Sequence, residues 1–150
     1  MWVTCGCGRR HYGPYGAAGL VLRDGTGRLL MAHRSEFVHF PGTWAFPGGA
    51  LERGESPVDA ALREMAEEIG VPRGAARVLS TMAGTDHGVW RYTYVLADLA
   101  PEWTELRLDL NWETEAVSWV APAEMTDLPL HPDLRSDLPA LHAALGLGVA

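Results

Sequence analysis

Three glutamates, Glu64, Glu67 and Glu68, occupy positions i, i+3 and i+4 of one short segment. In a helix, carboxylates at this spacing lie on one side. Like charges placed in this way repel each other and weaken an isolated helix by roughly 0.2–0.5 kcal/mol per pair. Hard divalent cations such as Mg²⁺ take oxygen ligands and would offset the repulsion. The spacing therefore predicts a divalent-cation site.

The residues around the glutamates carry the start and stop signals of a helix. Ser56 is a good N-cap, Pro57 suits the first helical position, and Asp59 can complete a capping box. Gly70 and then Pro72 end the helix.

One face of this helix is predicted to pack into the core, because apolar residues recur at helical spacing at Val58, Leu62, Met65 and Ile69. At about 100° per residue, Glu64 and Glu68 lie about 100° from this stripe, and Glu67 lies further round toward solvent.

The rest of the chain alternates short apolar runs with turn signals. Strands are predicted at 17–22, 28–33, 77–83, 89–96 and 115–120, and helices at 121–127 and 136–145. Trp90, Tyr92 and Tyr94 alternate, so they share one face of their strand. Residues 1–16 are Gly-rich and polar and are predicted to form an irregular arm. Residues 17–150 then form a single α/β sandwich domain.

Composition excludes several classes of partner. The chain has 150 residues, is 47% hydrophobic and carries 19 acidic against 12 basic residues, a formal charge of −7. One domain with one core is expected, without the basic footprint of a protein that binds duplex nucleic acid or an anionic membrane surface. The N-terminus lacks an apolar signal core, and two cysteines are too few for a disulfide framework. A cytoplasmic enzyme fits these properties.

The glutamates belong to a longer pattern: Gly, five residues, Glu, seven residues, then Arg-Glu-apolar-any-Glu-Glu-any-Gly-apolar. Nine specified positions over 23 residues fill it without a gap: Gly49, Glu55, Arg63, Glu64, Met65, Glu67, Glu68, Gly70 and Val71. This stretch resembles the Nudix box. The segment GTWAFPGG before it and VSWV near the end extend the resemblance to a whole Nudix domain.

The resemblance implies a Nudix-type α/β/α sandwich with a mixed sheet, and hydrolysis of a nucleoside diphosphate linked to another moiety. Glu64, Glu67 and Glu68 would then ligate Mg²⁺ or Mn²⁺, and Glu64 or Glu68 would orient or deprotonate the attacking water. The carbonyl group of Gly48 or Gly49 would be a further ligand. The resemblance also implies that Glu55 and Arg63 pair and brace the loop against the helix.

An additional acidic ligand is expected from a loop outside the box. Glu113 and Glu115 are the candidates, and Glu113 is preferred because Glu115 belongs to the predicted strand. The alternative that both are solvated surface charges stays open.

Side chains that could contact a nucleotide are more widely spread. Arginines can clamp phosphates, and aromatic rings can stack on a base. The candidates are Arg34, Arg91, Trp44 and Trp90, with Arg9, Arg10, Phe40, Tyr92 and His87 as weaker ones. Surface positions for the arginines and His87, and core positions for the aromatics, are the competing interpretations.

Cys5, Cys7 and His11 could contribute to a zinc site, which His33 or His39 could complete. The competing interpretation is an arm with incidental thiols.

The leading hypothesis is a metal-dependent pyrophosphohydrolase acting on a small-molecule nucleotide. A nucleoside triphosphate, ADP-ribose, a nucleotide sugar or a dinucleoside polyphosphate would each fit, and a capped RNA is less favoured. A non-catalytic Nudix-like nucleotide sensor is the alternative, although such a module would be expected to lose box carboxylates. An isoprenoid diphosphate isomerase would need a cysteine near the centre of the chain. Exposed aromatic residues could supply a homodimer interface.

Overall fold

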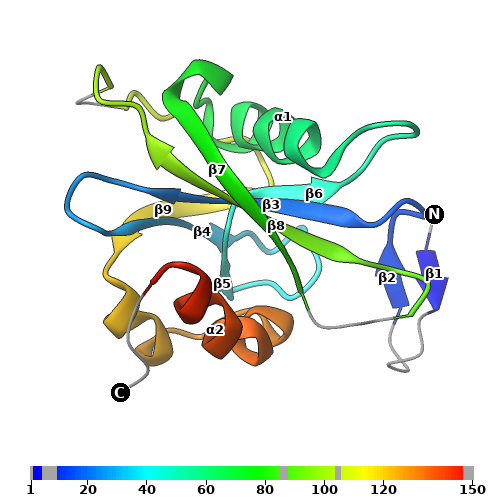
Figure 1. Cartoon of the computed structure of the whole chain (residues 1–150). Coiled ribbons are helices and arrows are strands. Elements are labelled where there is room, and N and C mark those ends of the chain that lie inside the picture. Colours follow the sequence, from blue (N-terminus) through cyan, green and yellow to red (C-terminus); the bar gives the residue numbers. More distant parts are fainter. Residues whose placement is uncertain (1, 5–9, 85–87, 104–105, 147–150) are drawn as a thin grey trace.

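The computed structural model describes residues 2–4, 10–84, 88–103 and 106–146. A twisted sheet lies between two helices, α1 (Pro57–Ile69) and α2 (Pro132–Ala144), which cover opposite faces (Figure 1). The strands of this sheet are β3 (Ala17–Arg23), β4 (Leu29–Arg34), β5 (Trp44–Ala45), β6 (Gly48–Ala50), β7 (Ala76–Ala83), β8 (Tyr92–Leu99) and β9 (Thr114–Val120). Short 3₁₀ helices follow α1 at Arg73–Ala75 and β9 at Pro122–Asp127.

The sheet is mixed, as predicted. Its order is β5-β4-β3-β8-β7, with β6 paired to β3 and β9 paired to β4. The central β3–β8 pair is parallel, whereas β8–β7 and β4–β9 are antiparallel. The α/β sandwich and its mixed sheet are therefore confirmed.

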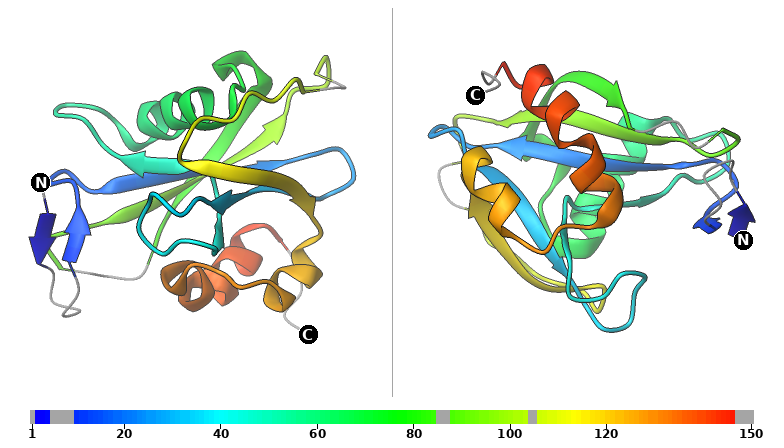
Figure 2. Two further views of the ribbon diagram at one scale, coloured as in Figure 1. Left: turned by 180° about the vertical axis from the view of Figure 1, so that it is seen from behind. Right: turned by 90° about the horizontal axis from the view of Figure 1, so that it is seen from below.

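Strands β3 and β4 separate soon after the turn that joins them. Their register contains one pair, Arg23↔Leu29. At its other end, β3 pairs through Ala17–Gly19 with β6, while β4 pairs along its length with β9. The two strands thus form the arms of a fork, with β6 on one arm and β9 on the other (Figures 1 and 2).

Alternation along β3 divides the core between the two faces of the sheet. Leu20 and Leu22 pack on the side of α1, together with Met65 and Ile69. The opposite cluster contains Val21 from β3, residues of β4 and β8, and the α2 leucines Leu134, Leu138 and Leu141. Each fully buried side chain of this size contributes about 1.5–3 kcal/mol relative to exposure, so both helices are held by apolar burial.

Helix α1 begins and ends where its sequence predicts. Ser56 Oγ accepts a hydrogen bond from the Asp59 amide at 3.1 Å, and Gly70 ends the helix with φ of 76°. The Asp59 carboxylate accepts from Arg73 Nη2 at 2.7 Å, and among the described residues no hydrogen bond from the Ser56 amide to Asp59 completes the expected capping box.

The N-terminal segment contains regular structure that its composition did not predict. Strands β1 (Trp2–Thr4) and β2 (Arg10–Tyr12) form an antiparallel pair in which Trp2 lies opposite Tyr12. Figure 2 shows this hairpin at one side of the main sheet. The irregular arm expected for residues 1–16 is thus wrong for these two strands. Cys5 and Cys7 of the predicted zinc site lie outside the described residues, as does His87.

Two further boundaries differ from expectation. Strand β8 begins at Tyr92, with Trp90 forming an isolated bridge before it. Helix α2 begins four residues earlier than predicted, because Pro132 occupies its first turn and the His131 Nδ1 accepts from the Asp133 amide at 3.2 Å.

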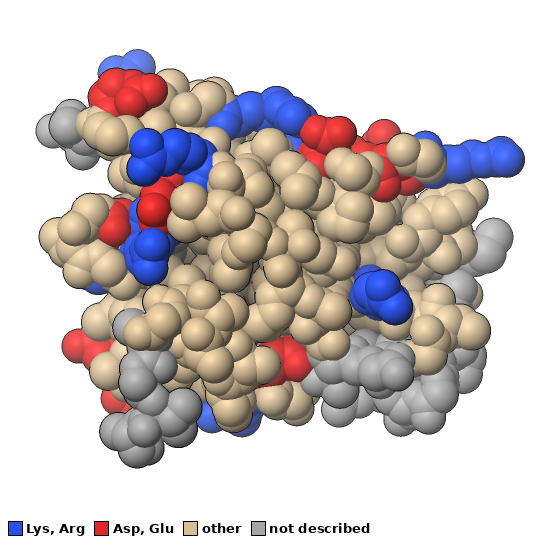
Figure 3. Space-filling model, viewed as in Figure 1, with Lys and Arg blue, Asp and Glu red and all other residues tan. Residues whose placement is uncertain are grey.

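Most of the face seen in Figure 3 is neither acidic nor basic. Within the described ranges, no helix combines the length and apolarity needed to cross a bilayer.

Candidate metal centre and substrate cavity

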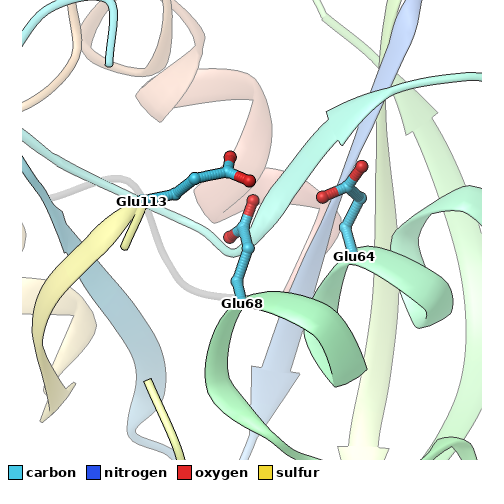
Figure 4. Close-up of side chains that lie close together, drawn as sticks. All are labelled: Glu64, Glu68 and Glu113. Atoms are coloured by element: carbon cyan, nitrogen blue, oxygen red, sulfur yellow. The ribbon is translucent and has the colours of Figure 1, made fainter. Parts of the chain in front are cut away.

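Two neighbouring turns of α1 and one loop bring three carboxylates together. Glu64 and Glu68 are 8% and 6% exposed, and Glu113 lies immediately before β9. One ligand oxygen from each lies within 4.8 Å of the others. Figure 4 shows the three side chains pointing toward one another. Three converging carboxylate oxygens fit a hard divalent cation such as Mg²⁺ or Mn²⁺.

The loop that carries Glu113 is fixed to the end of α1. The amides of Asp109 and Asn111 donate to the carbonyl oxygens of Ile69 and Glu68 at 2.9 and 2.8 Å. These bonds satisfy carbonyl groups that a helix end leaves without intrahelical partners. The same contacts hold Glu113 beside Glu68.

The other glutamates of the predicted site point elsewhere. Glu115 lies within β9, and its Oε2 is 3.3 Å from His33 Nδ1. Glu67 is exposed, and its Oε2 is 3.3 Å from Arg63 Nη1. The acidic cluster found among the described residues consists of Glu64, Glu68 and Glu113, and Glu67 is not a member.

Two glycines allow the carboxylates to lie against the backbone. The Gly48 amide donates to Glu68 Oε2 at 3.3 Å. A Cβ on Gly49 would lie 2.6 Å from Glu64 Cδ, so any side chain there would collide with the carboxylate. Gly49, the first residue of the box, thus makes room for Glu64, and Gly48 before it supplies a donor to Glu68.

Arg63 links the loop to the helix. Its Nε and Nη2 donate to Glu55 Oε2 and Oε1 at 2.8 and 2.9 Å, and Nη2 also donates to the Ala50 carbonyl at 3.1 Å. This pairing follows the box resemblance. Hydrogen bonds from Arg63 lower the pKa of Glu55 to about 2, and the Glu55 partner raises the pKa of Arg63.

The cluster itself resists ionisation. Burial raises the pKa of Glu64, with Arg63 opposing the shift through its charge and a hydrogen bond of 2.9 Å. The pKa of Glu68 lies well above its ordinary value, first because of burial and then because of the charges of Glu64 and Glu113. A bound divalent cation would favour the ionised form of both groups.

The carboxylate cluster borders a cavity of about 780 Å³, whose lining includes Glu64, Glu113, Gly48 and Gly49. This volume is within the range of small-molecule sites. The candidate substrate residues Arg34 and Trp90 also line it. Arg34 Nε donates to the His39 carbonyl at 2.7 Å, and burial lowers the pKa of its guanidinium, with the charge of Glu68 opposing.

Trp44 and Arg91 are not among the residues that line this cavity. The Trp44 ring packs against His33 at a centroid distance of 5.0 Å and joins the core on the side of α2. Arg91 is exposed, and its carbonyl accepts from the Ala17 amide. The position of Trp44 therefore agrees with the core interpretation, and that of Arg91 agrees with the surface interpretation.

Sequence reasoning missed several lining side chains, among them Trp2, Phe37, Trp112 and His131. They come from four separate segments, and no spacing in the sequence relates them.

Comparison with known proteins places the chain among hydrolases. The sequence model of the NUDIX domain matches residues 14–141. A "putative 8-oxo-dGTP diphosphatase 3" of Mycobacterium tuberculosis is 40% identical over 154 aligned residues, covering 95% of this chain and 69% of the relative. A "CTP pyrophosphohydrolase" of Escherichia coli K12 is 30% identical over 133 residues, covering 89% of this chain and 92% of that protein.

Solved structures share the fold. The Nudix hydrolase RenU of M. smegmatis superimposes with a TM-score of 0.84 at 33% identity, covering 100% of this chain and 98% of its own. An Ap4A hydrolase of C. elegans has a TM-score of 0.70 at 23% identity, covering 87% of this chain and 98% of its own, a likeness of fold alone. Together with the intact box, these matches show that the chain belongs to the NUDIX family, as a MutT-like Nudix hydrolase.

Proposed function

We propose that this hydrolase cleaves a phosphoanhydride bond of a nucleoside triphosphate and depends on Mg²⁺ or Mn²⁺. The observation that carries the proposal is the convergence of Glu64, Glu68 and Glu113 at the edge of a nucleotide-sized cavity. The names of two relatives, a putative 8-oxo-dGTP diphosphatase and a CTP pyrophosphohydrolase, each contain a nucleoside triphosphate. This favours a triphosphate over the ADP-ribose and nucleotide-sugar alternatives.

Glu64, Glu68 and Glu113 would hold the cation, with the Gly48 carbonyl and Glu67 as proposed further contributors. When bound, a divalent cation neutralises phosphate oxygens and lowers the pKa of water. The carboxylates supply the negative charge that retains it. Arg34, which lines the same cavity, would pair with a phosphate oxygen.

Glu68 is our candidate general base. Arg63 donates to Glu64 Oε1 at 2.9 Å, which makes that carboxylate less basic. Glu68 accepts from the neutral Gly48 amide instead, and burial is the largest cause of its raised pKa. In this environment Glu68 would be the stronger proton acceptor of the two carboxylates.

The test is a release assay for pyrophosphate and phosphate. Nucleoside triphosphates, including oxidised forms, ADP-ribose, nucleotide sugars and dinucleoside polyphosphates are each incubated with Mg²⁺, Mn²⁺ or chelator. We expect metal-dependent cleavage of a nucleoside triphosphate. Glu68→Gln should lower kcat by at least about 100-fold, the scale of lost general-base catalysis.

Glu124→Gln is the matched control, because Glu124 is an exposed glutamate in the 3₁₀ helix after β9. Full activity of Glu68→Gln would refute the assignment of Glu68. Nucleotide binding in Mg²⁺ without cleavage of any compound would favour the sensor instead. A cytoplasmic location and a homodimer remain predictions from the sequence.

A further inference from the structure

Four aromatic rings from three distant segments form a continuous series along the cavity. The Trp2 and His39 rings meet edge to face with centroids 5.4 Å apart, His39 and Phe40 are 4.2 Å apart, and Phe40 and His131 are 4.6 Å apart. All four residues line the cavity that also contains Glu64 and Glu113. The N-terminal hairpin, the loop after β4 and the start of α2 therefore meet in one aromatic wall, defined here as Trp2, His39, Phe40 and His131.

The two ends of this wall are held differently. The His131 ring is fixed at the start of α2, because its Nδ1 accepts from the Asp133 amide at 3.2 Å. Trp2 comes from β1, whose strand partner is β2 rather than a strand of the main sheet. Although it lines the cavity, Trp2 is 42% exposed. A large ring in this position leaves apolar surface available to a ligand.

The polyphosphate and the base of a nucleotide suit different parts of the cavity lining. The polyphosphate is anionic and suits the proposed cation and Arg34. A nucleobase is a flat, uncharged ring, which gains by stacking on aromatic side chains with little dependence on base identity. The three carboxylates suit a cation and not an uncharged base. The aromatic wall, in contrast, gives the base a surface to stack on in the same cavity.

We propose that Trp2 contacts the nucleobase of the substrate and thereby selects nucleotides over inorganic polyphosphate, so that the N-terminal hairpin forms part of the substrate site. This inference rests on the proposed nucleotide substrate. His39 positions Trp2 through the edge-to-face contact and joins the hairpin to the loop after β4.

The test separates recognition of the base from recognition of the phosphates. Calorimetric titration in Mg²⁺ compares two probes on the full chain: non-hydrolysable α,β-methylene nucleoside triphosphates and inorganic tripolyphosphate. The wild type should bind the nucleotides more tightly. Trp2→Ala should weaken nucleotide binding about fivefold or more and leave tripolyphosphate binding unchanged, and Trp2→Phe should restore most of the loss.

Two variants guard against an indirect effect. His39→Ala leaves the hairpin sequence intact and should also weaken only nucleotide binding. Leu79→Ala removes an apolar side chain of comparable exposure, 53%, from β7, away from the cavity lining, and should bind both probes as the wild type does.

Three results would overturn the inference: unchanged nucleotide affinity in Trp2→Ala, an equal loss for both probes, or a wild type that binds tripolyphosphate as tightly as nucleotides. These outcomes do not depend on turnover. If no compound is hydrolysed but Trp2→Ala selectively weakens nucleotide binding, the proposed reaction fails and the base contact stands.

Discussion

Arg63 and Glu55 form a two-point ion pair, with Nε–Oε2 and Nη2–Oε1 distances of 2.8 and 2.9 Å. Arg63 is 22% and Glu55 14% exposed, so the pair is shielded from much of the solvent. The same guanidinium contacts Ala50, Glu64 and Glu67. The pair therefore joins the loop before α1 to the face of the helix that carries the carboxylate cluster.

We expect Glu55→Gln to destabilise the protein by about 1–3 kcal/mol at pH 7, the range of a charge-assisted bond that is lost. The pKa of Glu55 falls from 4.5 to about 2 in the folded state. The stabilisation is thus fully present above about pH 4.5 and is lost as pH falls toward 2.

Urea unfolding at pH 7 and at pH 3 checks this prediction. The difference between wild type and Glu55→Gln should shrink at the lower pH. Glu52→Gln is the control, because Glu52 is 70% exposed and its carboxylate lies 3.8 Å from Arg63 Nε. A gap between wild type and Glu55→Gln that stays constant from pH 7 to pH 3 would show that the ionised carboxylate contributes no stability.

Gly49→Ala should damage the site while the fold survives. The new Cβ would lie 2.6 Å from Glu64 Cδ and displace the carboxylate. We expect kcat/KM to fall at least about tenfold, because misplacement of about 1 Å costs on that order or more. Steady-state kinetics and circular dichroism measure the two properties.

Gly25→Ala provides the comparison, since nothing lies within 4 Å of a Cβ built at Gly25. Wild-type kinetics in Gly49→Ala would show that Glu64 can move without loss of function.

Divalent cations should stabilise the folded protein even without substrate. A ligand at 100 times its Kd raises the free energy of unfolding by about 2.7 kcal/mol. Mg²⁺ or Mn²⁺ should therefore raise the melting temperature of the wild type, and chelator should reverse the rise. Glu113→Gln should reduce the response if Glu113 holds the cation, and an undiminished rise in that variant would remove Glu113 from the site.

A buried bond between β8 and α2 gives a further prediction. Tyr94 Oη donates to Asp137 Oδ2 at 2.7 Å, and both residues are buried, with 2% and 6% exposure. Tyr94→Phe should destabilise the fold by about 1–3 kcal/mol, because the buried carboxylate loses a donor. Thermal or urea unfolding would measure the loss. Tyr15→Phe, at a tyrosine that is 51% exposed, should unfold as the wild type does, and an equally stable Tyr94→Phe would contradict the assignment.

Local signals predicted much of the molecule. Helix α1 could be predicted because Ser56, Pro57 and Gly70 determine its ends within a few residues of chain. Glu113 could be preferred over Glu115 because Glu115 falls within the predicted strand at 115–120 and Glu113 precedes it. Helical periodicity likewise predicted the exposed position of Glu67, although the box resemblance led us to expect a metal ligand there.

Long-range contacts could not be predicted in this way. The β1–β2 pair forms in a polar, Gly-rich segment whose composition indicates no strand. The contact between Trp2 and His39 depends on where that hairpin packs, and no sequence period relates the two residues. Trp44 and Trp90 look alike as aromatic candidates, yet only the tertiary packing places the buried Trp90 on the cavity lining and packs the partly buried Trp44 against the core on the side of α2.

The fork between β3 and β4 has a mechanical consequence. Glu64 and Glu68 lie on α1, which packs on the β3–β6 arm, while Glu113 leads into β9 on the β4 arm. A cation held by all three would act as a crosslink between arms whose own register is limited to Arg23 and Leu29. Binding of the cation would then make the open end of the sheet more rigid. The cation would thus have a structural role in addition to its role as a cofactor.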